Sequence, residues 1–77
     1  MVFPKREIVD RIKAEYPKGS RVRLLHMDDP YRDIPVGTGG TVESVDDTGT
    51  IHVAWDTGNH LGIVYGEDSC EKISTGI

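Results

Sequence analysis

Two Asp-Thr-Gly triplets, at residues 47–49 and 56–58, are the segments of this 77-residue chain that most directly suggest chemistry. Used as a pair, such triplets can place two carboxylates about 3 Å apart, where they share one proton and activate water for peptide hydrolysis. Here one predicted strand separates the two triplets, and the extended backbone from Thr50 to Trp55 alone spans about 16 Å. The two carboxylates therefore cannot share a proton within one chain. Their flanking residues instead predict two hairpin turns.

Three other patterns fall short of a reactive or ligand-binding site. The glycine-rich segment 37–41 lacks the lysine and the following helix of a phosphate-binding loop. Segment 46–49 lacks the alternating acidic ligands of a calcium loop. The candidate ligands for a soft metal are not spaced in the pairs of a structural zinc site: they are His26, His52, His60 and Cys70. We therefore expect no enzyme activity, no metal and no cofactor.

Aromatic and acidic side chains in two predicted loops form the candidate binding site. One loop contributes Tyr31, Asp28 and Asp29, and the last sharp turn is preceded by Trp55 and Asp56. In small β-barrels such loops often meet on one rim, where aromatic rings and carboxylates line a peptide groove. We predict a non-enzymatic module that binds a short, basic segment of another protein through these five residues. Strand alternation turns much of the Trp55 ring toward the core, so its exposure stays open.

The charges are divided unevenly along the chain. Residues 1–26 hold seven basic and three acidic residues, a net +4, and the remainder holds two basic and ten acidic residues, a net −8. This division indicates either that the basic half contacts a nucleic acid or that the two halves of the chain attract each other. The acidic total argues against a dedicated nucleic-acid binder. The alternative function is nonetheless nucleic-acid binding through the basic half, with these residues: Arg6, Arg11, Lys13, Lys18, Arg21 and Arg23.

A short amphipathic helix is predicted over residues 5–16. Ile8, Val9, Ile12 and Tyr16 recur at spacings of three and four and form one apolar stripe. A proline suits the first turn at position 4, and another cannot continue the helix at position 17. Because about 12 residues form a marginal helix in isolation, the stripe must pack on something else. If that surface belongs to another chain, the protein is an oligomer.

From residue 20 onward the hydrophobic period changes to two, which predicts strands at 21–26, 41–45, 50–55, 61–65 and 71–73. The alternation slips once between Val42 and Val45, as it does at a β-bulge. A long first loop, 27–40, precedes a tight meander. This layout is typical of a five-stranded SH3-like barrel, so we predict one mainly-β domain, 1–77, with an N-terminal helical part at 1–17 and the barrel at 18–74.

Four stretches together resemble a known family: Tyr16–Leu24, Met27–Tyr31, Pro35–Val42 and Ile51–Gly58. The chain is similar, over roughly residues 16–73, to a bacterial and phage family of mobile elements, domain of unknown function 4314. That resemblance implies a small SH3-like barrel and no known activity. A looser similarity to the peptide-binding barrels of mind-bomb-type ubiquitin ligases runs through residues 39–42 and 53–58. It offers an analogy in fold only.

The composition also bears on the compartment and the partners. No apolar run approaches the roughly 20 residues of a membrane span, residues 1–18 lack the features of a signal peptide, and Cys70 is the single cysteine. We therefore expect a cytoplasmic protein with no membrane partner. A protein partner is predicted, nucleic acid is possible, and the oligomeric state stays open.

Overall fold

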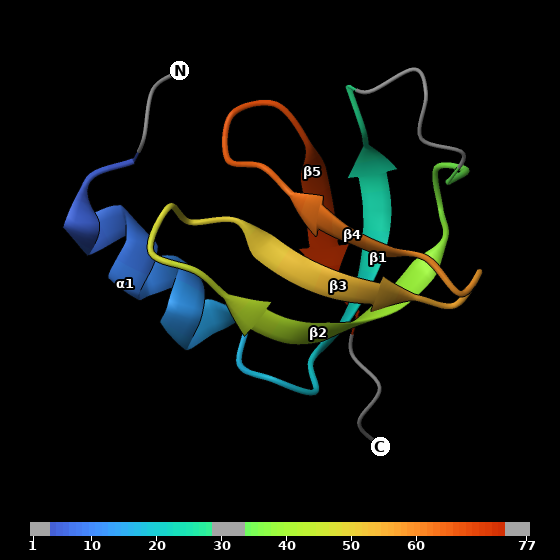
Figure 1. The fold of residues 1–77 in the computed structure, drawn as a ribbon, viewed down its shortest axis with the longest axis horizontal. Helices are drawn as coiled ribbons and strands as arrows, with labels where there is room; N and C mark the ends of the chain where they lie inside the picture. The colour runs from blue at the N-terminus through green and yellow to red at the C-terminus, as the bar shows by residue number, and fades with distance from the viewer. Residues whose placement is uncertain (1–3, 29–33, 74–77) are drawn as a thin grey trace.

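The computed structural model describes residues 4–28 and 34–73, which form one helix and a five-stranded sheet. Helix α1 is followed by strands in this order: α1 (Arg6–Glu15), β1 (Arg21–His26), β2 (Gly39–Val45), β3 (Ile51–Trp55), β4 (His60–Ile63) and β5 (Ser69–Lys72). All neighbouring strands are antiparallel, in the order β4-β3-β2-β1-β5. Figure 1 shows α1 beside one end of the curved sheet. The predicted mainly-β fold with one N-terminal helix is confirmed.

Helix α1 packs through its predicted stripe on the turn between β2 and β3. Val9 is buried, and Ile12 and Tyr16 pack against the core. Gly49, at the tip of this turn, has φ +82°, and a Cβ atom there would lie 2.9 Å from Pro4 Cγ and 3.5 Å from Ile12 Cδ1. The helix therefore approaches the sheet at a residue that has no side chain.

The core lies on the inner face of the sheet, where the predicted alternation places it. The buried core residues come from every strand except β5, and one, Ile34, lies in the connection between β1 and β2: Val22, Leu24, Ile34, Val42, Ile51, Val53, Trp55 and Ile63. Between β2 and β3 the register shifts after Val42. This shift confirms the predicted bulge in β2. Removing these large apolar side chains from water is the main force that holds so small a domain together.

Strand β4 ends at Ile63, two residues earlier than the sequence predicted. The Asp68 carboxylate accepts the Val64 N–H at 3.1 Å, and the Val64 carbonyl accepts the N–H groups of Glu67 and Asp68. These bonds close a tight turn that takes Tyr65 out of the sheet and leaves it 46% exposed. The short last strand begins at Ser69, two residues before its predicted start.

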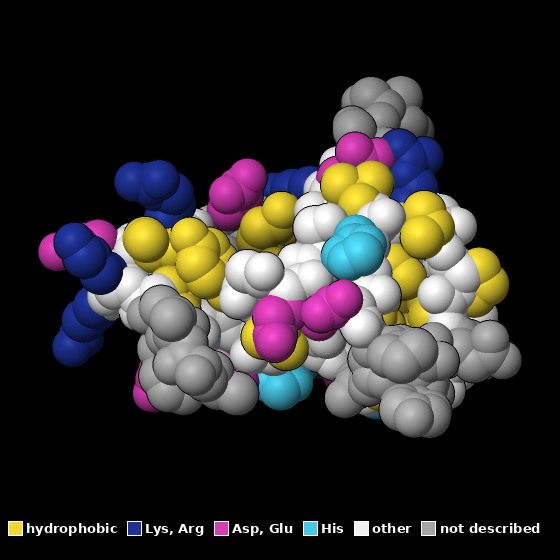
Figure 2. Space-filling view, turned by 90° about the horizontal axis from the view of Figure 1, so that it is seen from above, with side chains coloured by type: hydrophobic (Ala, Val, Ile, Leu, Met, Phe, Trp, Pro, Cys, Tyr) yellow, Lys and Arg dark blue, Asp and Glu magenta, His cyan; other side chains and the backbone are white. Residues whose placement is uncertain are grey.

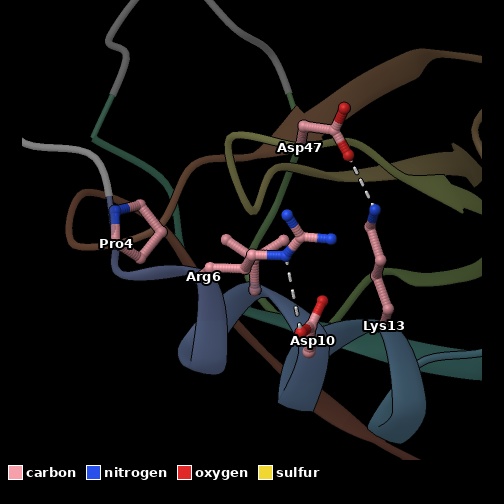
Figure 3. Close-up of a pocket in the computed structure, with 6 residues that line it drawn as sticks. Pro4, Arg6, Asp10, Lys13 and Asp47 are labelled. Carbon is pink, nitrogen blue, oxygen red and sulfur yellow. Dashed lines mark hydrogen bonds and ion pairs between the residues drawn. The ribbon is translucent and has the colours of Figure 1, made fainter.

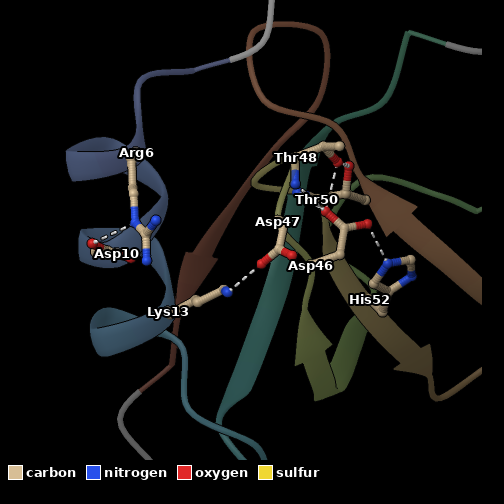
Figure 4. A network of polar contacts seen from close by, with 8 residues as sticks. All are labelled: Arg6, Asp10, Lys13, Asp46, Asp47, Thr48, Thr50 and His52. Carbon is tan, nitrogen blue, oxygen red and sulfur yellow. Dashed lines mark hydrogen bonds and ion pairs between the residues drawn. The ribbon is translucent and has the colours of Figure 1, made fainter.

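The turn between β2 and β3 is organised around the Asp46 carboxylate (Figure 4). One of its oxygens accepts the backbone N–H groups of Thr48 at 2.9 Å and Thr50 at 3.1 Å, and the other lies 2.8 Å from His52 Nε2. Burial by itself would raise the pKa of Asp46, but the hydrogen bonds from Thr48, His52 and Thr50 outweigh it and lower the pKa to about 2.

Replacing Asp46 with alanine should lower the free energy of unfolding by about 1 kcal/mol near neutral pH, since two backbone donors lose their acceptor in a partly solvated turn. Because the native pKa is depressed, the contribution is complete above the unfolded value of about 3.9 and disappears as the pH falls toward 2. Urea unfolding at both ends of this range measures the change. An alanine penalty that stays constant across the range would contradict the account.

Candidate functional site

Trp55, the central aromatic residue of the predicted acidic and aromatic rim, is not at the surface. Trp55 is only 3% exposed, and its Nε1 donates to the Leu61 carbonyl at 3.1 Å. Trp55 therefore lies in the core, as the strand alternation favoured, and presents almost no surface to a partner. The ring turns inward because Gly40 stands opposite it in β2 and offers no side chain to exclude it.

The remaining rim residues do not come together in the part of the chain that the structure describes. Asp56 is held at the start of β1, where its two oxygens bind the Arg21 guanidinium at 2.9 and 2.6 Å. Asp28 lies beyond the far end of β1, and its N–H donates to Asp68 Oδ1 at 2.9 Å. A six-residue strand separates these carboxylates by about 16 Å. Tyr31 and Asp29 lie outside the described residues.

Most of the basic residues of the alternative nucleic-acid surface are paired with carboxylates. Three of the six contact the acidic part of the chain, as Lys13–Asp47, Arg21–Asp56 and Arg23–Glu71. Arg6 lies 4.0 Å from Asp10 on its own helix. Within residues 4–28 and 34–73, Arg11 and Lys18 form no ion pair. The uneven charge along the chain thus corresponds largely to attraction between its two halves.

The Arg21–Asp56 ion pair lies directly beside Gly39. A Cβ atom at Gly39 would lie 2.8 Å from Arg21 Nη2 and 2.9 Å from Asp56 Oδ2, so any other residue there would make the ends of these two side chains shift. The bond from Arg21 lowers the pKa of Asp56 and raises the pKa of Arg21. This geometry fixes the start of β1 to the end of β3 and gives both side chains a structural role.

A polar hollow of about 350 Å³ lies between α1 and the turn that joins β2 to β3 (Figure 3). Its charged side chains form two opposite-charge pairs, Arg6 with Asp10 and Lys13 with Asp47. Arg6 and Asp47 are 93% and 98% exposed, so water screens both of these charges. Each cation already has a carboxylate beside it. The hollow therefore favours no particular ligand charge.

A second, more apolar groove of about 320 Å³ lies on the other side of Gly49. We call it the α1–β5 groove. One wall is the C-terminal part of α1, the floor includes Ile51 and Ile63, and the opposite wall is the Tyr65–Asp68 turn with the start of β5. Its lining residues are Ile12, Glu15, Tyr16, Gly49, Ile51, Ile63, Tyr65, Gly66, Asp68, Ser69 and Cys70.

The charged groups at the α1–β5 groove are all acidic. Glu15 and Asp68 line it from opposite walls, and neither lysine nor arginine is among its lining residues. Burial raises the pKa of the Cys70 thiol to about 11. Burial also raises the pKa of Tyr16, and the charges of Cys70 and Glu15 add to that shift. Thiol and phenol are thus neutral at pH 7, so neither is in its deprotonated, nucleophilic form.

Figure 2 shows the molecule from above, turned by 90° about the horizontal axis from the view of Figure 1. A group of hydrophobic side chains lies on its left part, where Figure 1 places α1, with Lys and Arg side chains at the outer edge, and acidic side chains lie near the middle. Within residues 4–28 and 34–73, no three potential metal ligands gather into a site. Over the same residues, no helix is long and apolar enough to cross a membrane.

A family model described as a domain of unknown function, DUF4314, matches residues 5–73. The chain belongs to this family. The match confirms the resemblance seen in the sequence and extends it over α1, so the helix is an integral part of the DUF4314 domain. None of the curated proteins matches the chain.

Sequence reasoning about this DUF4314 domain missed the groove residues Tyr65 and Asp68. Tyr65 continues an apolar run, which predicted a strand, whereas the turn depends on Asp68 accepting the Val64 N–H. The Gly66-Glu67-Asp68 sequence that follows Tyr65 is typical of a turn and could have indicated it. The same carboxylate also accepts the backbone N–H of Asp28, which is one of the predicted rim residues.

Proposed function

We propose that this DUF4314 domain is a non-enzymatic interaction module that binds a short segment of another protein in the α1–β5 groove. The groove supports this proposal by its size, because about 320 Å³ admits one or two large side chains. Its floor is apolar, and its two tyrosines combine apolar ring faces with polar tips, as aromatic residues at interfaces do.

Tyr65 is the observation that carries the proposal. Its side chain is nearly half exposed although it borders a floor made of the buried Ile51 and Ile63. The turn that bears it is closed by three hydrogen bonds around Val64 and Asp68, so the backbone at Tyr65 is already fixed. Binding of a partner would therefore cost little conformational entropy of the backbone at Tyr65, which favours binding at this position.

The test is selection of a phage-displayed library of random short peptides on the immobilised wild-type domain. The selected peptide is then titrated against two variants, Tyr65→Ser and Val36→Ser. Val36 is the matched control because it is 69% exposed and does not line the groove. Tyr65→Ser should weaken binding about ten-fold or more, and Val36→Ser should leave it unchanged.

Two results would overturn the proposal. One is equal binding of the selected peptide to wild type and to Tyr65→Ser, and the other is a selection that enriches no peptide above the background on a blank surface. Circular dichroism of both variants checks that each is folded before binding is compared.

Nucleic-acid binding through the basic half is the competing proposal. It has less support, because four of its six residues already have carboxylates within 4.0 Å. Each of those contacts would have to be exchanged for a phosphate contact. Binding to duplex or single-stranded DNA that weakens steeply with added salt would favour it over the groove.

A further inference from the structure

We infer that the segment bound in the α1–β5 groove inserts an arginine, whose aliphatic stem lies on the apolar floor and whose guanidinium lies between Glu15 and Asp68. This inference rests on the proposed function and specifies the partner's chemistry. It follows from the two charged side chains that line the groove, Glu15 and Asp68, since both are carboxylates.

Glu15 occupies the last position of α1. A carboxylate there opposes the helix dipole, which favours cations in the last turn and anions in the first. The other charged side chain of this turn, Lys13, obeys that rule and binds Asp47. Among residues 4–28 and 34–73, no basic group lies within ion-pair distance of Glu15. Its negative charge thus disfavours the helix end and remains available to a cation in the groove.

Asp68 presents a carboxylate whose orientation is fixed. Its Oδ1 accepts the Asp28 N–H at 2.9 Å, and its Oδ2 accepts the Val64 N–H at 3.1 Å. Each carboxylate oxygen can accept a second hydrogen bond, so both remain able to receive donors from a ligand. Two fixed oxygens match the planar fork of a guanidinium better than the single point charge of an ammonium.

The groove also fits the rest of an arginine side chain. Long basic side chains place their aliphatic stems on apolar surface while the charged head reaches a polar edge. Here the apolar surface is supplied by Ile51, Ile63 and Cys70, and the acidic edge by Glu15 and Asp68. A lysine could satisfy the charge but not both oxygens of Asp68. A neutral or acidic segment would bring no positive charge to Glu15 and Asp68.

The test uses the peptide selected on the wild-type domain, synthesised once with its arginine and once with citrulline, which keeps the shape and removes the charge. Two variants of the domain, Glu15→Gln and Glu7→Gln, are compared. Glu7 is the matched control because it lies on the same helix, in the first turn, and outside the groove. Both variants change the net charge by the same amount.

We expect Glu15→Gln to weaken binding of the arginine peptide about five-fold without lowering the thermal midpoint of the domain, and Glu7→Gln to leave binding unchanged. Citrulline should weaken wild-type binding about ten-fold. Selected peptides that depend on Tyr65 but contain no arginine, or that bind equally well with citrulline, would overturn this inference and leave the proposed function intact. Binding that does not depend on Tyr65 would overturn both.

Discussion

Replacing Gly40 with alanine should destabilise the domain by about 3 kcal/mol, more than any other change of a single methyl group that the structure indicates. A Cβ atom at this position would lie 2.5 Å from Val53 Cγ1, 2.8 Å from Trp55 Cε3 and 3.2 Å from the Ala54 carbonyl oxygen. Val53 and Trp55 are both buried, so neither can move into solvent to make room. The penalty therefore comes from overpacking of the core.

Gly58→Ala is the matched control for Gly40→Ala. Gly58 has φ +96°, but no atom lies within 4 Å of a Cβ atom built there, so alanine would meet backbone strain without a clash. That strain costs about 1 kcal/mol. Urea unfolding followed by the fluorescence of the single tryptophan measures both variants. If Gly40→Ala costs no more than Gly58→Ala, the close packing of β2 on β3 is contradicted.

Replacing Trp55 with alanine should leave the domain only marginally stable, with a measurable unfolded fraction at room temperature. Truncating a buried aromatic side chain costs about 3–5 kcal/mol, and a domain of this size stands near the lower end of the usual 5–15 kcal/mol. Alanine also removes the Nε1 donor that binds the Leu61 carbonyl. Circular dichroism against temperature measures the loss, since the variant has no tryptophan to fluoresce.

Trp55→Phe separates the packing of the ring from its hydrogen bond. Phenylalanine keeps much of the apolar contact and leaves the Leu61 carbonyl without this donor, so it should cost less than alanine. A Trp55→Ala protein that kept its thermal midpoint but lost its partner would contradict burial of the ring. It would restore the binding role that the sequence suggested for Trp55.

The strands were predictable because period-two alternation reports which side chains face inward. Strand β1 matched residues 21–26, and the slip of the pattern near Val42 located the bulge. The end of β4 was not predictable in this way, because it depends on the Asp68 carboxylate binding an N–H four residues earlier. Closure of the sheet into an SH3-like barrel stays a prediction from loop lengths and alternation.

The proposed groove has the kinds of side chain that the sequence favoured for a binding site, but they lie at other positions in the chain. The sequence favoured aromatic rings beside carboxylates, and the α1–β5 groove has both, but from Tyr16, Tyr65, Glu15 and Asp68. Its two walls are separated by about fifty residues in the chain, and no local pattern links them. Three of the ion pairs also join residues far apart in the chain, as in Arg21–Asp56, whose partners are 35 positions apart.

Binding of a protein segment in the α1–β5 groove is tested most directly by amide-shift mapping of the isotope-labelled domain with the selected peptide. The largest shifts should fall on residues of both groove walls, among them Glu15, Ile63, Tyr65 and Cys70, and Val36 should show none. Shifts confined to the basic residues of α1 and β1, or to the turn at Asp56, would contradict it.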